Sequence, residues 1–178
     1  MARLNAQELR TTPVDPEVAK NIKKHPISII LDNVLDTYNV GAIFRLADAI
    51  AADRVYLCGQ TETPPNSKIK KASVNTWQWV NWKYEASALD AIKAIRQAQP
   101  VVQIIAVEQD ERSIPWTEVS YQFPVAIIVG NETYGVSKEA LDASDIIVEL
   151  PMWGINTSLN VMVSCGIIAY EAMKQMKK

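Results

Sequence analysis

The sequence predicts an α/β protein with a mostly parallel sheet that is covered by helices on both faces. Two observations predict this fold class. Short apolar runs rich in β-branched residues recur along the chain, which is typical of buried strands. Segments with apolar residues at helical spacing lie between these runs. Strands that alternate with helices favour a parallel sheet, because each helix then connects two neighbouring strands across one face.

Five apolar runs are the candidate strands. In chain order they are residues 27–31 (ISIIL), 54–58 (RVYLC), 101–107 (VVQIIAV), 125–129 (VAIIV) and 145–150 (DIIVEL). The candidate helices are residues 40–50, 86–97, 138–141 and 158–173. We expect Asn39, Ser137 and Ser158 to be N-caps, since Asn and Ser accept hydrogen bonds from free backbone N–H groups at helix starts.

The length of 178 residues suits a single domain. We expect an N-terminal extension over residues 1–25 and one domain over residues 26–178. No segment is apolar and long enough for a leader or a membrane span, which predicts a soluble cytoplasmic protein. Cys58 and Cys165 lie in apolar surroundings and are expected to be small buried hydrophobes in a reducing compartment.

The charge and the metal-ligating residues exclude some classes of site. The net charge of −2 gives no bulk attraction for nucleic acid, although a local basic patch is enough to hold phosphates. His25 is the only histidine, and no Cys/His cluster exists, so no metal site is expected. The common dinucleotide, P-loop and serine-hydrolase motifs are also absent.

Three polar stretches follow candidate strands, at the edge of a parallel sheet where ligands bind. They are residues 32–45 (DNVLDTYNVGAIFR), 130–135 (GNETYG) and 151–160 (PMWGINTSLN). In the second, Glu132 lies between two glycines and is expected to be half-covered; the alternative is a glycine-rich turn with an exposed acid.

In the first stretch, Arg45 lies off the apolar stripe. Gly41 and Ala42 precede it by one turn, so its side chain can lie low across them toward the loop. The alternative is a solvated arginine paired with Asp48. A helical glycine costs about 1 kcal/mol relative to alanine, so Gly41 indicates that something needs the space.

The segment after the third stretch, residues 159–170, is apolar on nearly every side. A helix of this kind is buried, either in its own domain or against a partner subunit. The simpler interpretation, a capped core helix, assigns no function to Asn156 and Asn160.

Together the three stretches resemble the SpoU/TrmH family of RNA ribose 2′-O-methyltransferases, part of the SPOUT superfamily. The shared motifs are NVGAIFR at 39–45, IVGNExxGVS at 128–137 and LPMxGxxxSLNV at 150–161, in the order of the family. The segments AVEQ at 106–109 and KAS at 71–73 with Trp77 also resemble its tRNA-modifying branch.

The resemblance implies a deep trefoil knot at the C-terminal end of the sheet domain, a homodimer built partly on the last helix, and S-adenosylmethionine (AdoMet) as methyl donor, with S-adenosylhomocysteine as product. It implies catalytic positions at Asn39, Arg45, Glu132, Ser158 and Asn160, with Arg45 activating or orienting the ribose hydroxyl. It implies that AdoMet is held around Val107, Gly130, Leu150, Met152 and Leu159.

The expected function is therefore AdoMet-dependent RNA ribose 2′-O-methylation, with tRNA as the favoured substrate and rRNA as the alternative. The alternatives are a non-catalytic RNA-binding or assembly protein that retains the knotted fold, and an unrelated nucleotide-binding enzyme. RNA contacts are expected from the N-terminal extension and from lysine clusters, or else these are solvated basic edges. The clusters are residues 23–25, 68–71 and 174–178.

The chain departs from the family at Thr133-Tyr134, at Trp153 and at residues 155–157. We expect substrate choice to be determined at Trp153 and residues 155–157. Trp77, Trp79 and Trp82 could stack bases, but packing in a buried strand is the favoured interpretation.

Overall fold

Seven strands form one sheet, and every pair of neighbouring strands is parallel, in the part of the chain that the computed structural model describes (residues 4–12 and 14–176). The strand order across the sheet is β3-β2-β1-β6-β4-β7-β5. The strands are β1 (His25–Asp32), β2 (Ala52–Cys58), β3 (Trp82–Glu85), β4 (Gln103–Val107), β5 (Ile114–Pro115), β6 (Val125–Gly130) and β7 (Ile146–Glu149). All five predicted strands are confirmed, and β3 and β5 were not predicted.

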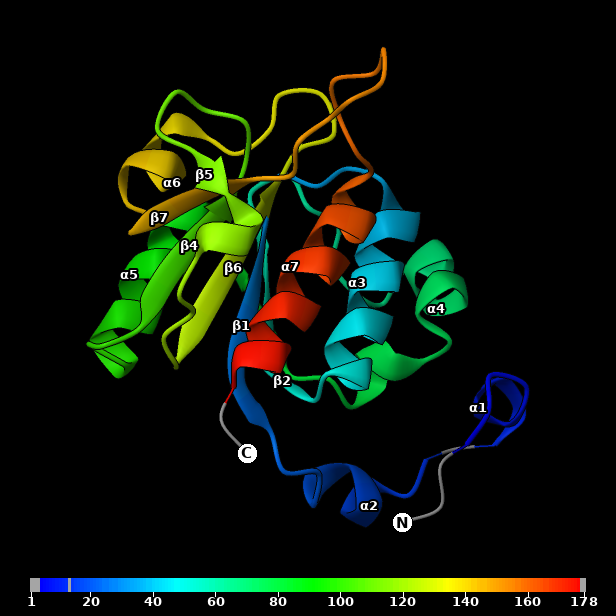
Figure 1. Cartoon of the computed structure of the whole chain (residues 1–178). Helices are drawn as coiled ribbons and strands as arrows, with labels where there is room; N and C mark the ends of the chain where they lie inside the picture. Colours follow the sequence, from blue (N-terminus) through cyan, green and yellow to red (C-terminus); the bar gives the residue numbers. More distant parts are fainter. Residues whose placement is uncertain (1–3, 13, 177–178) are drawn as a thin grey trace.

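Helices cover both faces of the sheet, as predicted (Figure 1). On one face lie α3 (Thr37–Ala49), α4 (Ser67–Ser73) and α7 (Val161–Gln175), and on the other α5 (Ala88–Ala98) and α6 (Lys138–Asp142). Alternate residues of β1 serve the two cores: Ile29 and Leu31 are buried under α3 and α7, and Ile30 is buried with residues of α5 and α6.

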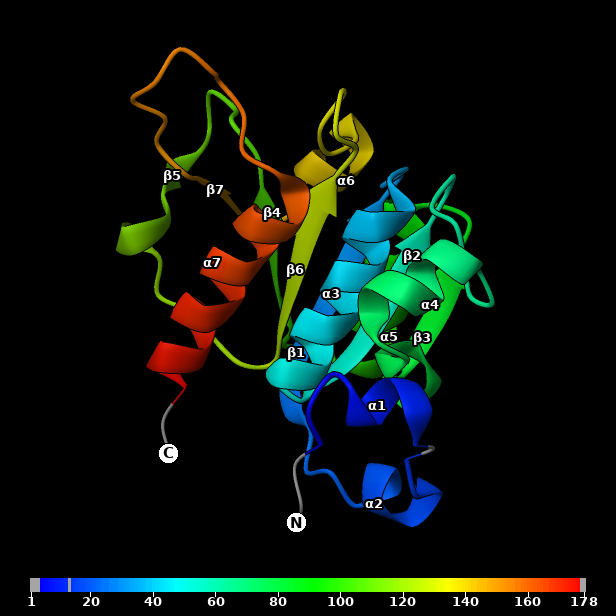
Figure 2. The ribbon, with the colours of Figure 1, turned by 90° about the vertical axis from the view of Figure 1, so that its right-hand side faces the viewer.

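The N-terminal helices α1 (Glu8–Thr11) and α2 (Pro16–Lys20) lie beyond the amino ends of the strands (Figure 2). One contact with the rest of the chain is a hydrogen bond of 2.8 Å from the Asn75 side chain to the carbonyl of Leu9. No helix within the described residues has the length and apolarity needed to cross a membrane.

Two predicted N-caps are wrong. Helix α3 is capped by Asp36, whose side chain accepts a hydrogen bond from the Tyr38 N–H at 2.8 Å, so Asn39 already lies inside the helix. Helix α7 is capped by Asn160, whose side chain accepts from two backbone N–H groups. Ser158 lies in the preceding loop, where its N–H and hydroxyl donate to Asn156. Ser137 does precede α6, but its side chain makes no capping hydrogen bond.

Helix α7 is buried on one side only within this chain. Cys165, Ile168 and Ala172 face the core, whereas Val163 is 39% exposed and Tyr170 is 56% exposed. The apolar composition of the helix therefore exceeds what its own domain buries.

The tryptophan-rich segment is not one buried strand. Trp77 lies in the 3₁₀ helix η1 (Thr76–Gln78), and Trp82 begins β3. Trp77, Trp79 and Trp82 are partly buried against the core beneath α3. A second 3₁₀ helix, η2 (Trp116–Glu118), follows β5.

Candidate active site

The three polar stretches meet at the carboxyl edge of the sheet (Figure 1). Strands β1 and β6 are neighbours, and Asp32 lies opposite Gly130 in the register, so the loops that follow them start side by side. The long loop of residues 150–160 leads from β7 to the start of α7 at the same edge.

Hydrogen bonds between side chains join these three stretches. The Asn160 side-chain nitrogen donates to the Asn39 side-chain oxygen at 3.0 Å. The Asn39 side-chain nitrogen in turn donates to a carboxylate oxygen of Glu132 at 2.9 Å. Asn39 is 8% exposed, so its two polar atoms need these partners. Asn39, Glu132 and Asn160, all predicted site residues, thus form one hydrogen-bonded chain.

The carboxylate of Glu132 accepts three N–H groups. Besides Asn39, the backbone N–H groups of Leu35 and Asp36 donate to it at 3.0 and 3.1 Å. Partial burial raises the pKa of this carboxyl, but the hydrogen bonds from Asn39, Leu35 and Asp36 outweigh that effect and hold the pKa below its ordinary value. Glu132 is therefore an ionised acceptor that fixes the start of α3, and it is a poor base.

The turn after β6 is fixed by residues that sequence reasoning missed. The Asn131 side chain accepts from the N–H groups of Thr133 and Tyr134 and donates to the carbonyl of Asn33. The buried carboxylate of Asp32 accepts from the Ser137 N–H at 2.8 Å. Asn131 stands beside Glu132 in the second motif, and that position is a signal that could have identified it.

Position 130 requires glycine, because the backbone of Gly135 and Val136 lies too close to it for a side chain. A Cβ at this position would lie 2.1 Å from the carbonyl carbon of Gly135 and 2.2 Å from the nitrogen of Val136. The Glu108 carboxylate accepts from the Val136 N–H at 2.8 Å and closes the turn from its other side. The turn therefore has little freedom to move.

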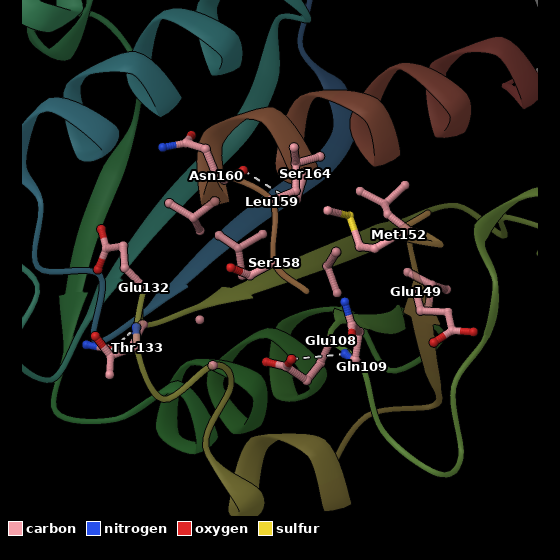
Figure 3. A pocket seen from close by; sticks show the side chains of 18 of the residues that line it. Glu108, Gln109, Glu132, Thr133, Glu149, Met152, Ser158, Leu159, Asn160 and Ser164 are labelled. Carbon is pink, nitrogen blue, oxygen red and sulfur yellow. Dashed lines mark hydrogen bonds between the residues drawn. The ribbon is translucent and has the colours of Figure 1, made fainter. Parts of the chain in front are cut away.

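A cavity of about 350 Å³ opens beside this network, within the range of small-molecule sites (Figure 3). All five residues expected around the cofactor line it, namely Val107, Gly130, Leu150, Met152 and Leu159. Of the expected catalytic residues, Glu132, Ser158 and Asn160 line it as well. In Figure 3, Glu132 and Asn160 lie at one end of the cavity, and Gln109 and Glu149 lie at the other.

The cavity walls have a distinct chemical character. Among the described residues, those that line it include three carboxylates, of Glu108, Glu132 and Glu149, but no lysine, arginine or histidine. Gln109, another residue that sequence reasoning missed, donates to the Thr157 carbonyl at 2.6 Å and ties the 150–160 loop to the end of β4. A cavity lined by carboxylates and apolar side chains favours a ligand with positive charge and apolar surface.

Arg45 is the one expected catalytic residue that neither lines the cavity nor belongs to the hydrogen-bonded chain. Its side chain is exposed on α3. Asp48 accepts a hydrogen bond from the Trp79 indole at 2.6 Å, and within residues 4–12 and 14–176 no ion pair joins it to Arg45. The expectation that Gly41 makes space for the Arg45 side chain is wrong. A Cβ at Gly41 would lie 2.5 Å from the Cβ of Ala72, so the space is filled by α4.

Comparisons with known proteins agree with this site. The family model described as "SpoU rRNA Methylase family" matches residues 26–170. A tRNA (guanosine(18)-2′-O)-methyltransferase of Thermus thermophilus is 30% identical over 152 residues, which cover 85% of this chain and 76% of that protein. The enzyme of the same name from Aquifex aeolicus is 31% identical over 160 residues, covering 88% and 72%.

Solved structures show the same fold. The A. aeolicus TrmH/SpoU tRNA modifying enzyme superposes with a TM-score of 0.76 at 29% identity, covering 96% of this chain and 81% of that one. The SpoU methyltransferase AviRb from Streptomyces viridochromogenes, solved in complex with AdoMet, has a TM-score of 0.76 at 23% identity, covering 87% and 62%.

Proposed function

Because the chain belongs to the SpoU rRNA methylase family, whose relatives are RNA 2′-O-methyltransferases, we propose that it transfers a methyl group from AdoMet to a ribose 2′-hydroxyl of tRNA. One observation carries the proposal. A cavity suited to a cationic cofactor opens against a hydrogen-bonded chain, Asn160–Asn39–Glu132, that joins all three family motifs.

The lining of the cavity fits AdoMet. Val107, Leu150, Met152 and Leu159 offer apolar surface for an adenine ring, and the backbone of Gly130 forms part of the same wall. The three carboxylates suit a sulfonium and an ammonium group. When bound, AdoMet supplies an electrophilic methyl group, and S-adenosylhomocysteine is the product that leaves.

The protein contributes mainly positioning, because transfer of a methyl group is an in-line displacement that depends on alignment. Glu132 and Asn160 hold the starts of α3 and α7 together at the mouth of the cavity. Ser158 adds a hydroxyl at the same wall.

Arg45 is proposed to orient the ribose hydroxyl or an adjoining phosphate. Its guanidinium keeps its proton at neutral pH and is a poor base, but it binds phosphate well. Its exposed position on α3, outside the cavity wall, suits a group that meets the RNA rather than AdoMet.

tRNA is the favoured substrate. The tRNA enzymes of T. thermophilus and A. aeolicus are 30% and 31% identical to this chain, whereas a 23S rRNA (guanosine-2′-O-)-methyltransferase of Ralstonia nicotianae is 26% identical over 159 residues. A non-catalytic RNA-binding protein with the same fold is the competing proposal, and it predicts no affinity for AdoMet.

Three further features of the family are proposed for this chain. The division into an extension over residues 1–25 and a domain over residues 26–178 accords with a family match that begins at residue 26, although β1 already begins at His25. The chain from residue 150 onward forms a deep trefoil knot, which accords with its path from β7 back to a position beside α3 and β6. Two copies associate through the exposed apolar side of α7, where Val163 and Tyr170 lie.

The experiment combines binding and transfer. Titration calorimetry with AdoMet measures binding, and labelled AdoMet is then offered with unmodified tRNA or rRNA transcripts. We expect AdoMet to bind and the label to enter tRNA at a higher rate than rRNA. Binding of RNA without binding of AdoMet supports the non-catalytic alternative, and faster transfer to rRNA overturns the choice of substrate.

A further inference from the structure

A second hollow lies at the same carboxyl edge of the sheet, away from the cofactor cavity. The loop after β2 and the edge strand β3 line it, with Gln60, Thr61, Glu62, Thr63, Trp82 and Tyr84. Tyr84 is 49% exposed, and its hydroxyl donates to the carbonyl of Gly59 at 3.2 Å. The tyrosine ring is therefore held against the loop while half of its surface remains open to solvent.

The wall of this hollow is joined to the candidate active site. The Thr61 hydroxyl accepts from the N–H of Val34 at 2.9 Å, and the N–H of Gln60 donates to the side chain of Asn33 at 3.0 Å. The loop that contains Asn33 and Val34 is the one whose other side is held by Glu132. The two sites therefore share one rigid loop.

The separation of the two sites suits one ligand strand. Strands β3, β2, β1 and β6 are consecutive neighbours in the sheet. Adjacent strands lie about 4.8 Å apart, so the end of β3 lies roughly 14 Å from the end of β6. A few nucleotides of single-stranded RNA span such a distance.

The chemistry of the hollow matches an unpaired nucleobase. Single-stranded RNA is recognised by stacking of bases on aromatic rings and by hydrogen bonds to base edges. Tyr84 offers the ring, the carboxylate of Glu62 can accept from base amino groups, and Gln60 can donate and accept.

Three exposed lysines follow the loop of this hollow in the chain. Helix α4 begins at Ser67, after this loop, and its Lys68, Lys70 and Lys71 are exposed. Lysines that follow such a loop in the chain are suited to contact the phosphates that flank a stacked base, and these contacts contribute affinity without sequence preference. The overall charge of −2 makes this local cluster the more informative feature.

We propose that the hollow at Tyr84 binds an unpaired base of the RNA substrate close to the methylated nucleotide, with the lysines of α4 on the adjoining phosphates. This inference rests on the proposed function, since it takes RNA as the substrate. It assigns Tyr84 a binding role that the cofactor cavity does not include.

The test compares Tyr84→Leu with Tyr84→Phe. The first removes the ring, and the second keeps the ring and removes only the hydrogen bond to Gly59. RNA affinity is measured by fluorescence anisotropy with a labelled unmodified tRNA transcript, AdoMet affinity by calorimetry, and folding by thermal unfolding.

Stacking of one base contributes roughly 5- to 160-fold in affinity. Tyr84→Leu should weaken RNA binding and raise the KM for RNA by about that factor, with kcat and AdoMet affinity unchanged. Tyr84→Phe should stay within about twofold of the native protein. Equal RNA affinity for the native protein and Tyr84→Leu overturns the proposal, as does an equal loss for Leu and Phe.

The lysines are tested separately through salt dependence. Replacing Lys68, Lys70 and Lys71 together by alanine should reduce the slope of log affinity against log salt by about 0.7 to 0.9 for each phosphate that the variant no longer neutralises. An unchanged slope removes α4 from the interface.

These measurements remain distinct from the test of function. If the native protein transfers methyl groups and Tyr84→Leu binds RNA with unchanged affinity, only the proposed RNA site at the hollow is contradicted. RNA binding that depends on Tyr84 without any methyl transfer contradicts the proposed function and leaves the hollow as an RNA site.

Discussion

Asn160 donates a hydrogen bond to the side chain of Asn39 at 3.0 Å, although 121 positions separate the two residues in the sequence. Asn160 is at the same time the N-cap of α7, and Asn39 also donates to Glu132. The starts of α3 and α7 and the turn after β6 are therefore one hydrogen-bonded unit. The cofactor cavity takes part of its wall from this unit.

Replacing Asn160 separates its two roles. Asn160→Ala removes the cap and the hydrogen bond to Asn39, so the free energy of unfolding should fall by about 1 kcal/mol or more. Asn160→Asp retains an oxygen that caps α7 but has no N–H to donate to Asn39. It should lose less stability in urea than Asn160→Ala, because the cap is kept and only the hydrogen bond to Asn39 is removed, and it should methylate RNA more slowly. Native stability in Asn160→Ala would contradict the role as a cap.

Glu132→Gln tests whether the ionised carboxylate of Glu132 stabilises the fold, because that contribution should depend on pH. Since the pKa of Glu132 lies below its ordinary value in the folded protein, its ionised form stabilises the fold above about pH 4, and this contribution is lost as the pH falls through the folded-state pKa. At pH 7 the variant should be less stable by about 1 to 2 kcal/mol, because charge-assisted hydrogen bonds are removed at a partly exposed site.

The comparison is made by urea unfolding at pH 7 and near pH 3. The difference between the native protein and Glu132→Gln should be largest at pH 7 and should shrink near pH 3. A difference of the same size at both values rules out an ionised Glu132 as the source of the stability.

Gly41→Ala tests the packing of α3 against α4. The new Cβ would lie 2.5 Å from that of Ala72 and 2.9 Å from the carbonyl oxygen of Ile69. Overpacking of this kind costs about 1 to 3 kcal/mol, which opposes the roughly 1 kcal/mol gained in helix propensity. The melting temperature should fall. Gly154→Ala is the control, because no described atom outside residues 153–155 lies within 4 Å of its new Cβ.

Val163→Glu tests the proposed dimer. The substitution places a charge on the exposed apolar side of α7, where burial against a second copy would be costly. We expect sedimentation to show a dimer for the native protein and a monomer for the variant. Gln97→Glu, at an exposed position of α5 on the other face of the sheet, should remain a dimer. A monomeric native protein contradicts the proposal.

Much of the fold could be predicted because buried parallel strands are continuous apolar runs. Strand β3 was missed for the opposite reason: its residues WKYE are polar or aromatic, and it pairs on one side only, with β2. Strand β5 has two residues, too few for any periodicity. Helix α4 buries only Ile69 and Ser73, so it has no apolar stripe to recognise.

The candidate site was less predictable, since its hydrogen bonds connect distant residues. The motifs indicated Asn39, Glu132 and Asn160, but the pairs they form span 93 and 121 positions, which no local pattern reveals. The choice of Asp36 over Asn39 as the cap follows from the same hydrogen bonds, because Asn39 is engaged with Glu132 and Asn160. Gly41 was correctly recognised as unusual, but the neighbour that requires it, Ala72, lies on a helix that was not predicted.

Identifying the methylated atom tests the proposed methyl transfer most directly. Native protein, Arg45→Lys and Arg45→Ala are incubated with methyl-labelled AdoMet and an unmodified tRNA transcript, and the RNA is digested to nucleosides and separated by chromatography. We expect label in a 2′-O-methylnucleoside for the native protein. We expect a loss of about 100-fold or more in Arg45→Ala, a smaller loss in Arg45→Lys, and AdoMet affinity unchanged in both. Absence of label, label on a base, or full activity of Arg45→Ala would contradict the proposal.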